Sequence, residues 1–283
     1  MPQRNPIYAS KAVGLTLAAV LALLSSGCTL TATNKAPDKL AAGWISLFDG
    51  RTLDGWTVKI VGHPAGEDPL QTFRARDGVL YVSYDKYEGK LESRFSHLFY
   101  KQPYKAYRLA LEYRFVDEKE TLNNPLKRKP FNSGVLYYSE SPQHMKLNQP
   151  FPISVEAQLL ATVIPQQDHV RYTGSACGMG TLVSIQGKPP VECFDSTEAE
   201  KPIGEWVRFD LEVRPDGHVT QSINGKPVAS FDRVHLDTSD ARFPSQEVID
   251  AQGGNQFLTS GYIALQSEGH PIEFRNIRLL PLE

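Results

Sequence analysis

Apolar and polar residues alternate with a period of two along Gly261–Leu280, the pattern of strands that have one buried face. Ile263 and Leu265 would share one face of a first strand, and Ile272 and Phe274 one face of a second. The short polar turn between them predicts a hairpin whose other face gathers Gln266, Glu268, His270, Glu273 and Arg275. A sheet with one apolar and one polar face suits a sandwich that binds a polar ligand, and sugars are the first candidates.

The same alternation recurs in short segments along the rest of the chain. They are Gly43–Phe48, Trp56–Val58, Phe73–Ser83, Ala106–Val116, Ser133–Ser139, Ser154–Ala161, Trp206–Arg214, Val219–Ile223 and Val228–Phe231, with long loops expected at Asn123–Lys129 and Gln143–Pro152. Turn residues separate the segments, and convincing helical periodicity is absent after the first 27 residues. The prediction is an all-β jelly-roll sandwich of two curved antiparallel sheets, with residues 43–283 as one domain.

Residues 1–27 have the features of a bacterial export signal, because Arg4 and Lys11 are followed by an apolar run too short to span a bilayer comfortably. Cys28 follows Ser-Gly, as in a lipobox, so we expect Cys28 to carry a lipid and residues 28–42 to form a tether. An ordinary cleaved signal is the alternative. The prediction is a lipid-anchored envelope protein that faces the periplasm or lies at the outer membrane.

Charge and motifs narrow the function classes. The 283 residues carry a formal charge of −2 and no basic stripe, which argues against nucleic acid as a partner. Neither a glycine-rich phosphate loop nor a nucleotide fingerprint occurs, so no cofactor is predicted. We expect a monomer or a weak oligomer whose only membrane contact is the lipid.

Cys177 and Cys193 are the two cysteines that remain once Cys28 is assigned to lipid. In an oxidising periplasm we expect them to form a disulfide, with two free thiols as the alternative. No CxxC or HxxxH spacing is present, so no structural metal site is predicted. A divalent cation held by carboxylates is left open.

Five parts of the chain occur in an order that resembles the 3-keto-disaccharide hydrolase family. They are WISLFDGRTLDGW, NSGVLYY, SVEAQLL, GEWVRFDLEV with INGKPV, and YIALQSEGHPIEFRNIRL. The resemblance covers Trp44–Leu280 and implies a concanavalin A-like jelly roll that cleaves 3-keto-glycosides. In that chemistry a base removes the C2 hydrogen of the oxidised sugar, the C1 substituent leaves by β-elimination, and water adds. The alternatives are a non-catalytic carbohydrate-binding module and a structural envelope lipoprotein.

Glu156 is the first candidate for the base. Alternation places Glu156 and Gln158 together, opposite Val155 and Ala157, and a mid-strand carboxylate partly screened by Tyr137 or Tyr138 would have a raised pKa. A solvated glutamate on an outer face is the alternative. Gln158 and Tyr138 would contact the substrate.

The turn after Gln266 supplies two more catalytic candidates, Glu268 and His270. Members of the family resemble LQxHG here, whereas this chain reads LQSEGHP, which moves the imidazole two positions on. His270 therefore either reaches the site from the far side of the turn or only caps the loop.

Four further side chains are predicted to contact the substrate: Asn132, Gln266, Arg275 and His97. Arg275 matches the FRN tripeptide of the family, and a salt bridge to Glu273 or Glu156 is its alternative role. Asn132 opens a strand at the rim, where turn chemistry would explain it equally well. His97 either faces the cleft or is an ordinary buried histidine.

Overall fold

The computed structural model describes residues 41–116, 131–162 and 172–283. Leu40–Glu283 forms one compact unit. The predicted signal 1–27, Cys28, residues 28–40 of the predicted tether and the predicted loop Asn123–Lys129 lie outside the described residues. Within these, no helix is long and apolar enough to cross a membrane.

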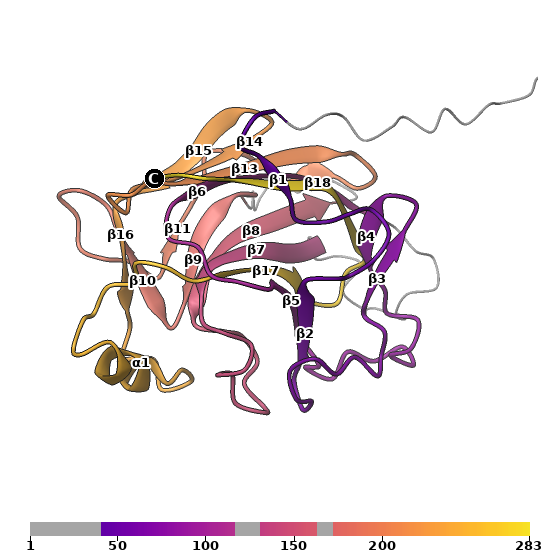
Figure 1. Ribbon diagram of the computed structural model, residues 1–283, viewed down its shortest axis with the longest axis horizontal. Helices are drawn as coiled ribbons and strands as arrows, with labels where there is room; N and C mark the ends of the chain where they lie inside the picture. Colours follow the sequence, from indigo (N-terminus) through magenta and orange to yellow (C-terminus); the bar gives the residue numbers. More distant parts are fainter. Residues whose placement is uncertain (1–40, 117–130, 163–171) are drawn as a thin grey trace, which may run out of the picture. The chain divides into compact units, whose positions relative to one another are not determined.

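Strands dominate the described part of the chain and form two large sheets (Figure 1). The first, named the β18 sheet here, has the order β15 (Lys226–Phe231), β14 (Val219–Ile223), β13 (Val207–Val213), β6 (Tyr107–Phe115), β18 (Ile272–Pro281), β4 (Val79–Val82), β3 (Phe73–Arg76), with β1 (Ile45–Ser46) paired to β18. The second, the β17 sheet, has the order β11 (Cys193–Phe194), β9 (Ser175–Met179), β8 (Ser154–Thr162), β7 (Phe131–Ser139), β17 (Tyr262–Ser267), β5 (Ser96–Tyr100), β2 (Trp56–Ile60), with β12 (Lys201–Pro202) parallel to β8. A small pair, β10 (Thr181–Ser184) and β16 (Arg233–Leu236), and helix α1 (Ser245–Ala251) complete the fold.

The two sheets pack face to face, and one apolar cluster fills the space between them. Ile263 and Leu265 of β17 enter it from one sheet, and Ile272 and Phe274 of β18 enter it from the other. All four side chains are at most 1% exposed. Apolar and polar residues therefore alternate because each strand buries one face in the shared core. The predicted all-β antiparallel sandwich is confirmed.

The predicted C-terminal hairpin is wrong. β17 pairs with β5 and β7, whereas β18 pairs with β1, β4 and β6, so the two strands belong to opposite sheets. The segment Glu268–Pro271 is a corner that leads the chain from one layer to the other. Because both strands turn their apolar residues inward, their polar residues lie on opposite outer faces of the sandwich.

Helix α1 was not expected from the sequence. It has seven residues, of which Ser245 and Ile249 are buried, so it is too short to show a helical period. Ile249 packs with Ile153, Leu236 and Phe243 in a small separate cluster.

The predicted disulfide between Cys177 and Cys193 is confirmed. The two residues are direct partners in the pairing of β9 with β11, so the bond ties the edge strand to the β17 sheet.

Candidate active site

The outer face of the β17 sheet carries a buried carboxyl group, that of Glu156. In β8, Val155 and Ala157 belong to the core, and alternation turns Glu156 to the opposite face. Its partners in register are Leu136 on β7 and Cys177 on β9. Glu156 is nonetheless only 1% exposed, which is rare for a carboxylate without a cationic partner.

Gly134 on β7 makes room for this carboxyl group. A Cβ at Gly134 would lie 2.5 Å from Glu156 Oε1 and 2.6 Å from its Cγ, so the side chain lies directly over the glycine. Gln266 Nε2 donates to Glu156 Oε2 across 3.2 Å. The glycine thus allows a residue on β8 to reach past β7 to a residue on β17, the strand on the far side of β7.

The corner after β17 brings a second carboxyl group to the same place. Asn132 Nδ2 donates to Glu268 Oε2 across 2.5 Å, and Ser133 Oγ donates to the carbonyl oxygen of Gln266. Tyr84 holds the corner in place, because its hydroxyl accepts the Gly269 N–H at 2.7 Å. The amide of Asn132 on β7 therefore holds the Glu268 side chain, and a buried tyrosine of the loop after β4 holds the backbone beside it.

The His270 side chain accepts a hydrogen bond from β7 that a backbone carbonyl of β17 would accept if that strand continued. The N–H of Asn132 donates to His270 Nδ1 across 3.2 Å, and the imidazole lies against the ring of Phe131 with centroids 4.7 Å apart. Burial lowers the pKa of His270 to about 4, so the ring is neutral at neutral pH. Since Nδ1 is an acceptor, the remaining proton lies on Nε2.

His97 lies on β5 directly opposite Gln266, and Lys59 on β2 lies directly opposite His97. Burial, with a smaller contribution from the charge of Lys59, lowers the pKa of His97 to about 3. Lys59 is itself 2% exposed and donates to the carbonyl oxygens of Ile60 and Leu147. His97 is thus a neutral buried histidine on the strand next to β17, directly opposite the glutamine that contacts Glu156.

Unpaired polar atoms concentrate here. Among the described residues, nine buried side-chain nitrogen or oxygen atoms make no hydrogen bond. Five of them belong to this group: Glu156 Oε1, Gln266 Oε1, Asn132 Oδ1, His270 Nε2 and His97 Nε2. A native fold rarely leaves such atoms unsatisfied, so a concentration of them indicates a place prepared for a polar ligand. The half-buried Asn132, Gln158 and Glu268 give the group its contact with solvent.

Burial raises the pKa of Glu156 well above its ordinary value, and the nearby charge of Glu268 raises it further. The hydrogen bond from Gln266 acts in the opposite direction. The raised pKa predicted for this carboxyl group is confirmed, and its cause is burial on the outer face. The raised pKa favours the protonated form of Glu156, and Oε1 is the carboxyl oxygen that makes no hydrogen bond.

Arg275 does not belong to this group. It lies on the outer face of the β18 sheet, where its Nε donates to Glu112 Oε2 across 2.6 Å and its guanidinium stacks on Trp206 at 3.8 Å. The predicted contact with the substrate of Glu156 depended on the hairpin, and the separation of β17 from β18 removes it. Neither Glu273 nor Glu156 is the ion-pair partner that the sequence suggested.

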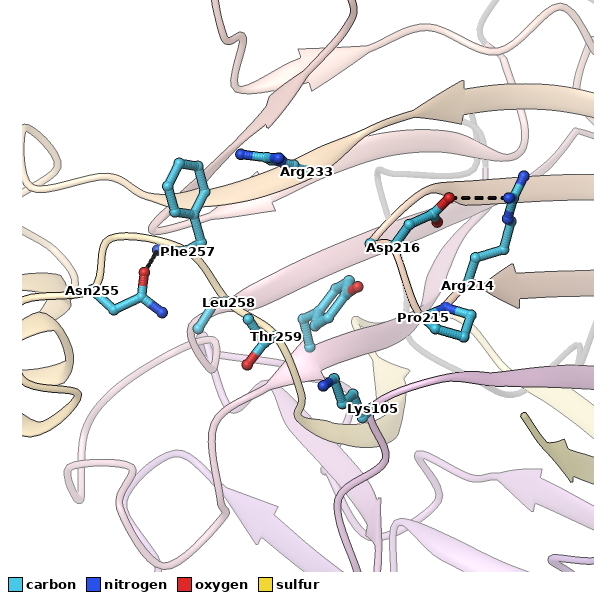
Figure 2. Close-up of a pocket in the computed structure, with 11 residues that line it drawn as sticks. Lys105, Arg214, Pro215, Asp216, Arg233, Asn255, Phe257, Leu258 and Thr259 are labelled. Atoms are coloured by element: carbon cyan, nitrogen blue, oxygen red, sulfur yellow. Dashed lines mark hydrogen bonds and ion pairs between the residues drawn. The ribbon is translucent and has the colours of Figure 1, made fainter. Parts of the chain in front are cut away.

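Tyr138 also lies elsewhere. A register irregularity and a left-handed φ of +52° interrupt the alternation of β7 at this residue, so its ring joins the core instead of the outer face. It lines a cavity of about 280 Å³ at one end of the sandwich (Figure 2). The expected screening of Glu156 by Tyr138 is therefore wrong.

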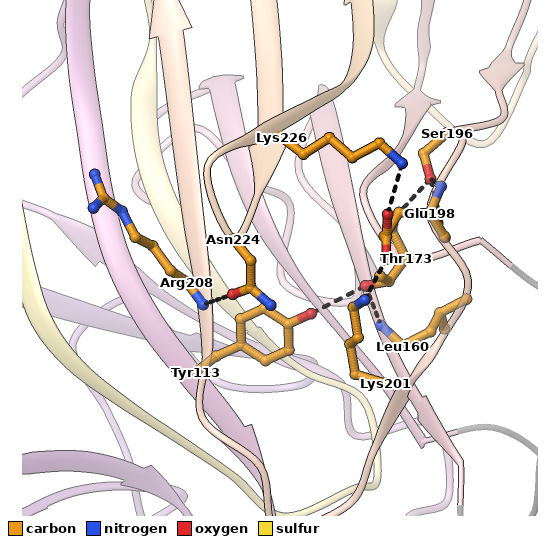
Figure 3. A network of polar contacts seen from close by, with 9 residues as sticks. All are labelled: Tyr113, Leu160, Thr173, Ser196, Glu198, Lys201, Arg208, Asn224 and Lys226. Atoms are coloured by element: carbon orange, nitrogen blue, oxygen red, sulfur yellow. Dashed lines mark hydrogen bonds and ion pairs between the residues drawn. The ribbon is translucent and has the colours of Figure 1, made fainter.

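A second polar cluster, around Glu198 and Thr173, differs from the Glu156 group because its charged side chains are paired. In Figure 3, Glu198 accepts from Lys201 and Lys226, and Thr173 Oγ1 accepts the Leu160 N–H at 3.0 Å. The Tyr113 hydroxyl lies 3.1 Å from the same Thr173 oxygen and so links the two sheets. Because its charged groups have opposite charges beside them, we assign this cluster a structural role.

Metal ligands do not gather at the site. No group of three or more His, Cys, Asp or Glu side chains in the described ranges could hold a metal ion. The side-chain oxygens of Glu156, Glu268 and Asn132, which are of the type that can bind a cation, nevertheless lie close together.

Comparisons with known proteins identify the family of the domain. Residues 43–280 match the 3-keto-alpha-glucoside-1,2-lyase-like domain, and the chain belongs to this family. No curated protein matches the chain.

Solved structures show the same fold. A presumed glycosyl hydrolase from Parabacteroides distasonis is 20% identical, with a TM-score of 0.50 over 84% of this chain and 99% of that one. A second from the same organism is 17% identical, with a TM-score of 0.48 over 85% and 94%. A carbohydrate-binding module from Bacillus subtilis is 9% identical, with a TM-score of 0.43 over 79% and 94%.

Sequence reasoning missed three residues that build the site: Gly134, Tyr84 and Lys59. A glycine inside a strand pattern signals close approach of another group, but nothing near it in the sequence identifies that group as Glu156. Tyr84 and Lys59 carry no local signal, because their partners are distant in the chain.

Proposed function

We propose that this domain cleaves 3-keto-glycosides by elimination followed by hydration. The observation that carries the proposal is the buried carboxyl group of Glu156, whose pKa is raised and which lies beside Glu268 and Gln266 among unpaired polar atoms. Membership of the lyase-like family gives the substrate class.

The proposed reaction needs an acid and a base side by side. A ketone at C3 makes the C2 hydrogen acidic, because the electrons left behind delocalise onto the ketone oxygen. The enzyme needs a base for that hydrogen and a donor for the oxygen that gains charge. The C1 oxygen then departs with its electron pair and takes up a proton, and water adds to the resulting enone.

We assign the donor to Glu156 and the base to Glu268. The sequence assigned the base to Glu156, but a carboxyl group whose pKa is raised by burial is the better acid. Glu156 Oε1 would donate to the C3 oxygen, and Glu268, held by Asn132, would remove the C2 hydrogen. The Nε2–H of His270 is a second donor within the same group.

The buried acid favours an enzyme over a carbohydrate-binding module. A module that only binds sugar has no need for a carboxyl group with a strongly raised pKa, whose burial costs stability. Structural ion-pair networks also shift pKa values, yet among the described residues Glu156 contacts an amide and no cation.

Cleavage of 3-keto-trehalose and 3-keto-sucrose, measured beside the unoxidised sugars, tests the proposal. We expect cleavage of the oxidised sugars alone, with a primary isotope effect when C2 carries deuterium. Glu268→Gln should abolish exchange of the C2 hydrogen with solvent, and Glu156→Gln should slow turnover about 100-fold or more. Equal cleavage of unoxidised sugars would reject the mechanism.

We further propose that Cys28 is lipidated and holds the domain at the cell envelope. The motif before Cys28 supports this. Incorporation of a labelled fatty acid into the protein, lost in Cys28→Ser, is the expected result, and a label that persists in the variant would refute it.

A further inference from the structure

A cavity lies away from the carboxyl group of Glu156. Its volume is about 280 Å³, and it opens where three segments meet: Lys105 before β6, the β13–β14 turn Arg214–Gly217, and the segment 255–259 before β17 (Figure 2). None of its lining residues belongs to the candidate active site. The proposed elimination therefore makes no use of it.

The charge around this cavity is positive. Three cations line it, Lys105, Arg214 and Arg233, together with one carboxylate, Asp216. Arg214 Nη2 pairs with Asp216 Oδ2 at 3.0 Å, whereas no ion pair is found for Lys105 or Arg233 within the described residues. Two cations therefore remain to attract an anion, and guanidinium binds carboxylate and phosphate in a bidentate manner.

The cavity also has aromatic and hydrogen-bonding groups suited to a sugar ring. The Arg233 guanidinium lies 5.3 Å from the centroid of the Phe257 ring, which fixes the cation beside an aromatic surface. Asn255 Oδ1 accepts the Phe257 N–H at 3.0 Å, so the amide nitrogen of Asn255 stays available as a donor. Thr259 adds a hydroxyl group.

One residue of the cavity wall, Tyr138, has a strained backbone conformation. Tyr138 has a φ of +52°, a backbone conformation that is unusual and unfavourable for a tyrosine. Gly261 permits this conformation, because a Cβ there would lie 2.3 Å from the carbonyl carbon of Tyr138. The chain thus accepts an unfavourable conformation that places the Tyr138 ring in the cavity wall.

We propose that this cavity binds an anionic monosaccharide, a single hexose ring that carries a carboxylate or a phosphate. The volume lies just below the range of about 300–1,000 Å³ usual for pockets that hold drug-sized ligands, so one ring fits better than a disaccharide. Arg233 and Lys105 bind the anionic group, and Phe257 with Tyr138 packs against the ring.

Isothermal titration of the full-length protein with glucuronate, glucose 6-phosphate, glucose and inorganic phosphate tests the proposal. We expect one of the two anionic sugars to bind more tightly than glucose and than phosphate, and the preferred sugar identifies the anionic group. Arg233→Gln and Lys105→Gln should each weaken that binding about tenfold or more, while Arg51→Gln, which removes an exposed cation elsewhere, should not.

Two measurements keep the outcome clear. Thermal unfolding of each variant without ligand shows that the fold is intact, and Glu156→Gln should bind the anionic sugar as the unchanged protein does. Equal affinity for glucose and for both anionic sugars would overturn the proposal, and so would loss of binding in Glu156→Gln. Unchanged affinity in folded Arg233→Gln and Lys105→Gln would overturn it as well.

Discussion

The side chain of Glu156 crosses Gly134 so closely that a methyl group on the glycine would come within 2.5 Å of Glu156 Oε1. Residues on neighbouring strands normally both carry a Cβ atom, which keeps their side chains apart. Gly134 has no Cβ atom, and the carboxyl group of Glu156 occupies that space. The position of the proposed acid therefore depends on the absence of a side chain on the adjacent strand.

Gly134→Ala should expel Glu156 from its place. We expect a loss of 1–3 kcal/mol in the free energy of unfolding, typical of overpacking, and loss of 3-keto-glycoside cleavage. Urea unfolding and initial rates measure both. In Gly134→Ala with Glu156→Ala the clash is removed, so the two stability effects should not add. Additive effects would show that the two side chains do not compete for space.

Glu156→Gln should change how stability depends on pH. Because the pKa of Glu156 is raised in the folded state, the folded protein binds its proton more tightly than the unfolded chain does. Stability from this group is thus complete below about pH 4.5 and is lost as the pH rises toward the raised value. The variant lacks this loss, so its melting temperature relative to the unchanged protein should increase with pH. A constant difference from pH 4 to 8 would contradict the burial effect.

His270 should act on stability in the opposite direction. Its pKa falls from an ordinary 6.5 to about 4, so the unfolded chain binds the proton more readily between these values. Stability is then complete above about pH 6.5 and is lost as the pH falls through this range. We expect His270→Gln to flatten that loss in thermal unfolding curves, with His218→Gln, a partly exposed histidine, as the control. The same slope in His270→Gln and in the unchanged protein would argue against a buried neutral imidazole.

Arg275→Gln and Gln266→Leu should separate the two outer faces. Arg275 pairs with Glu112 at a partly exposed position, so its loss should cost at most about 1 kcal/mol and leave cleavage unchanged. Gln266→Leu removes the amide that contacts Glu156 and should reduce kcat. Initial rates and melting temperatures of the two variants, measured together, check this. A loss of activity in Arg275→Gln would return Arg275 to the site.

Reduction of the Cys177–Cys193 bond should destabilise the domain. The bond closes a sequence separation of 16 residues, for which the chain-entropy model gives about 3 kcal/mol. Chemical unfolding of Cys177→Ser with Cys193→Ser, compared with the unchanged protein under oxidising conditions, measures it. Equal stability would mean that strand pairing alone holds β11 to β9.

Much of the fold follows from alternation, because each strand buries one face in a shared core. Ile263, Leu265, Ile272 and Phe274 are core residues as predicted. Alternation cannot tell which strands pair, however. A short turn between two such strands fits a hairpin or a corner between sheets, since the apolar residues point inward in both.

The candidate site was predicted in part. Glu156, Gln266 and Glu268 come together as expected, because their faces follow from alternation and from the turn. Tyr138 was misplaced because a positive φ breaks the period at that residue, and nothing in the residue type signals it. Local patterns carry no information on the contact between Gly134 and Glu156, which depends on strand register.

The corner Glu268–Pro271 has a consequence for how this protein can change over time. Outward-facing side chains before the corner border the candidate active site, whereas those after it lie on the opposite face of the sandwich. Substitution of outward-facing residues on β18 therefore alters the charge of one side of the molecule. The reaction on the other side would be untouched.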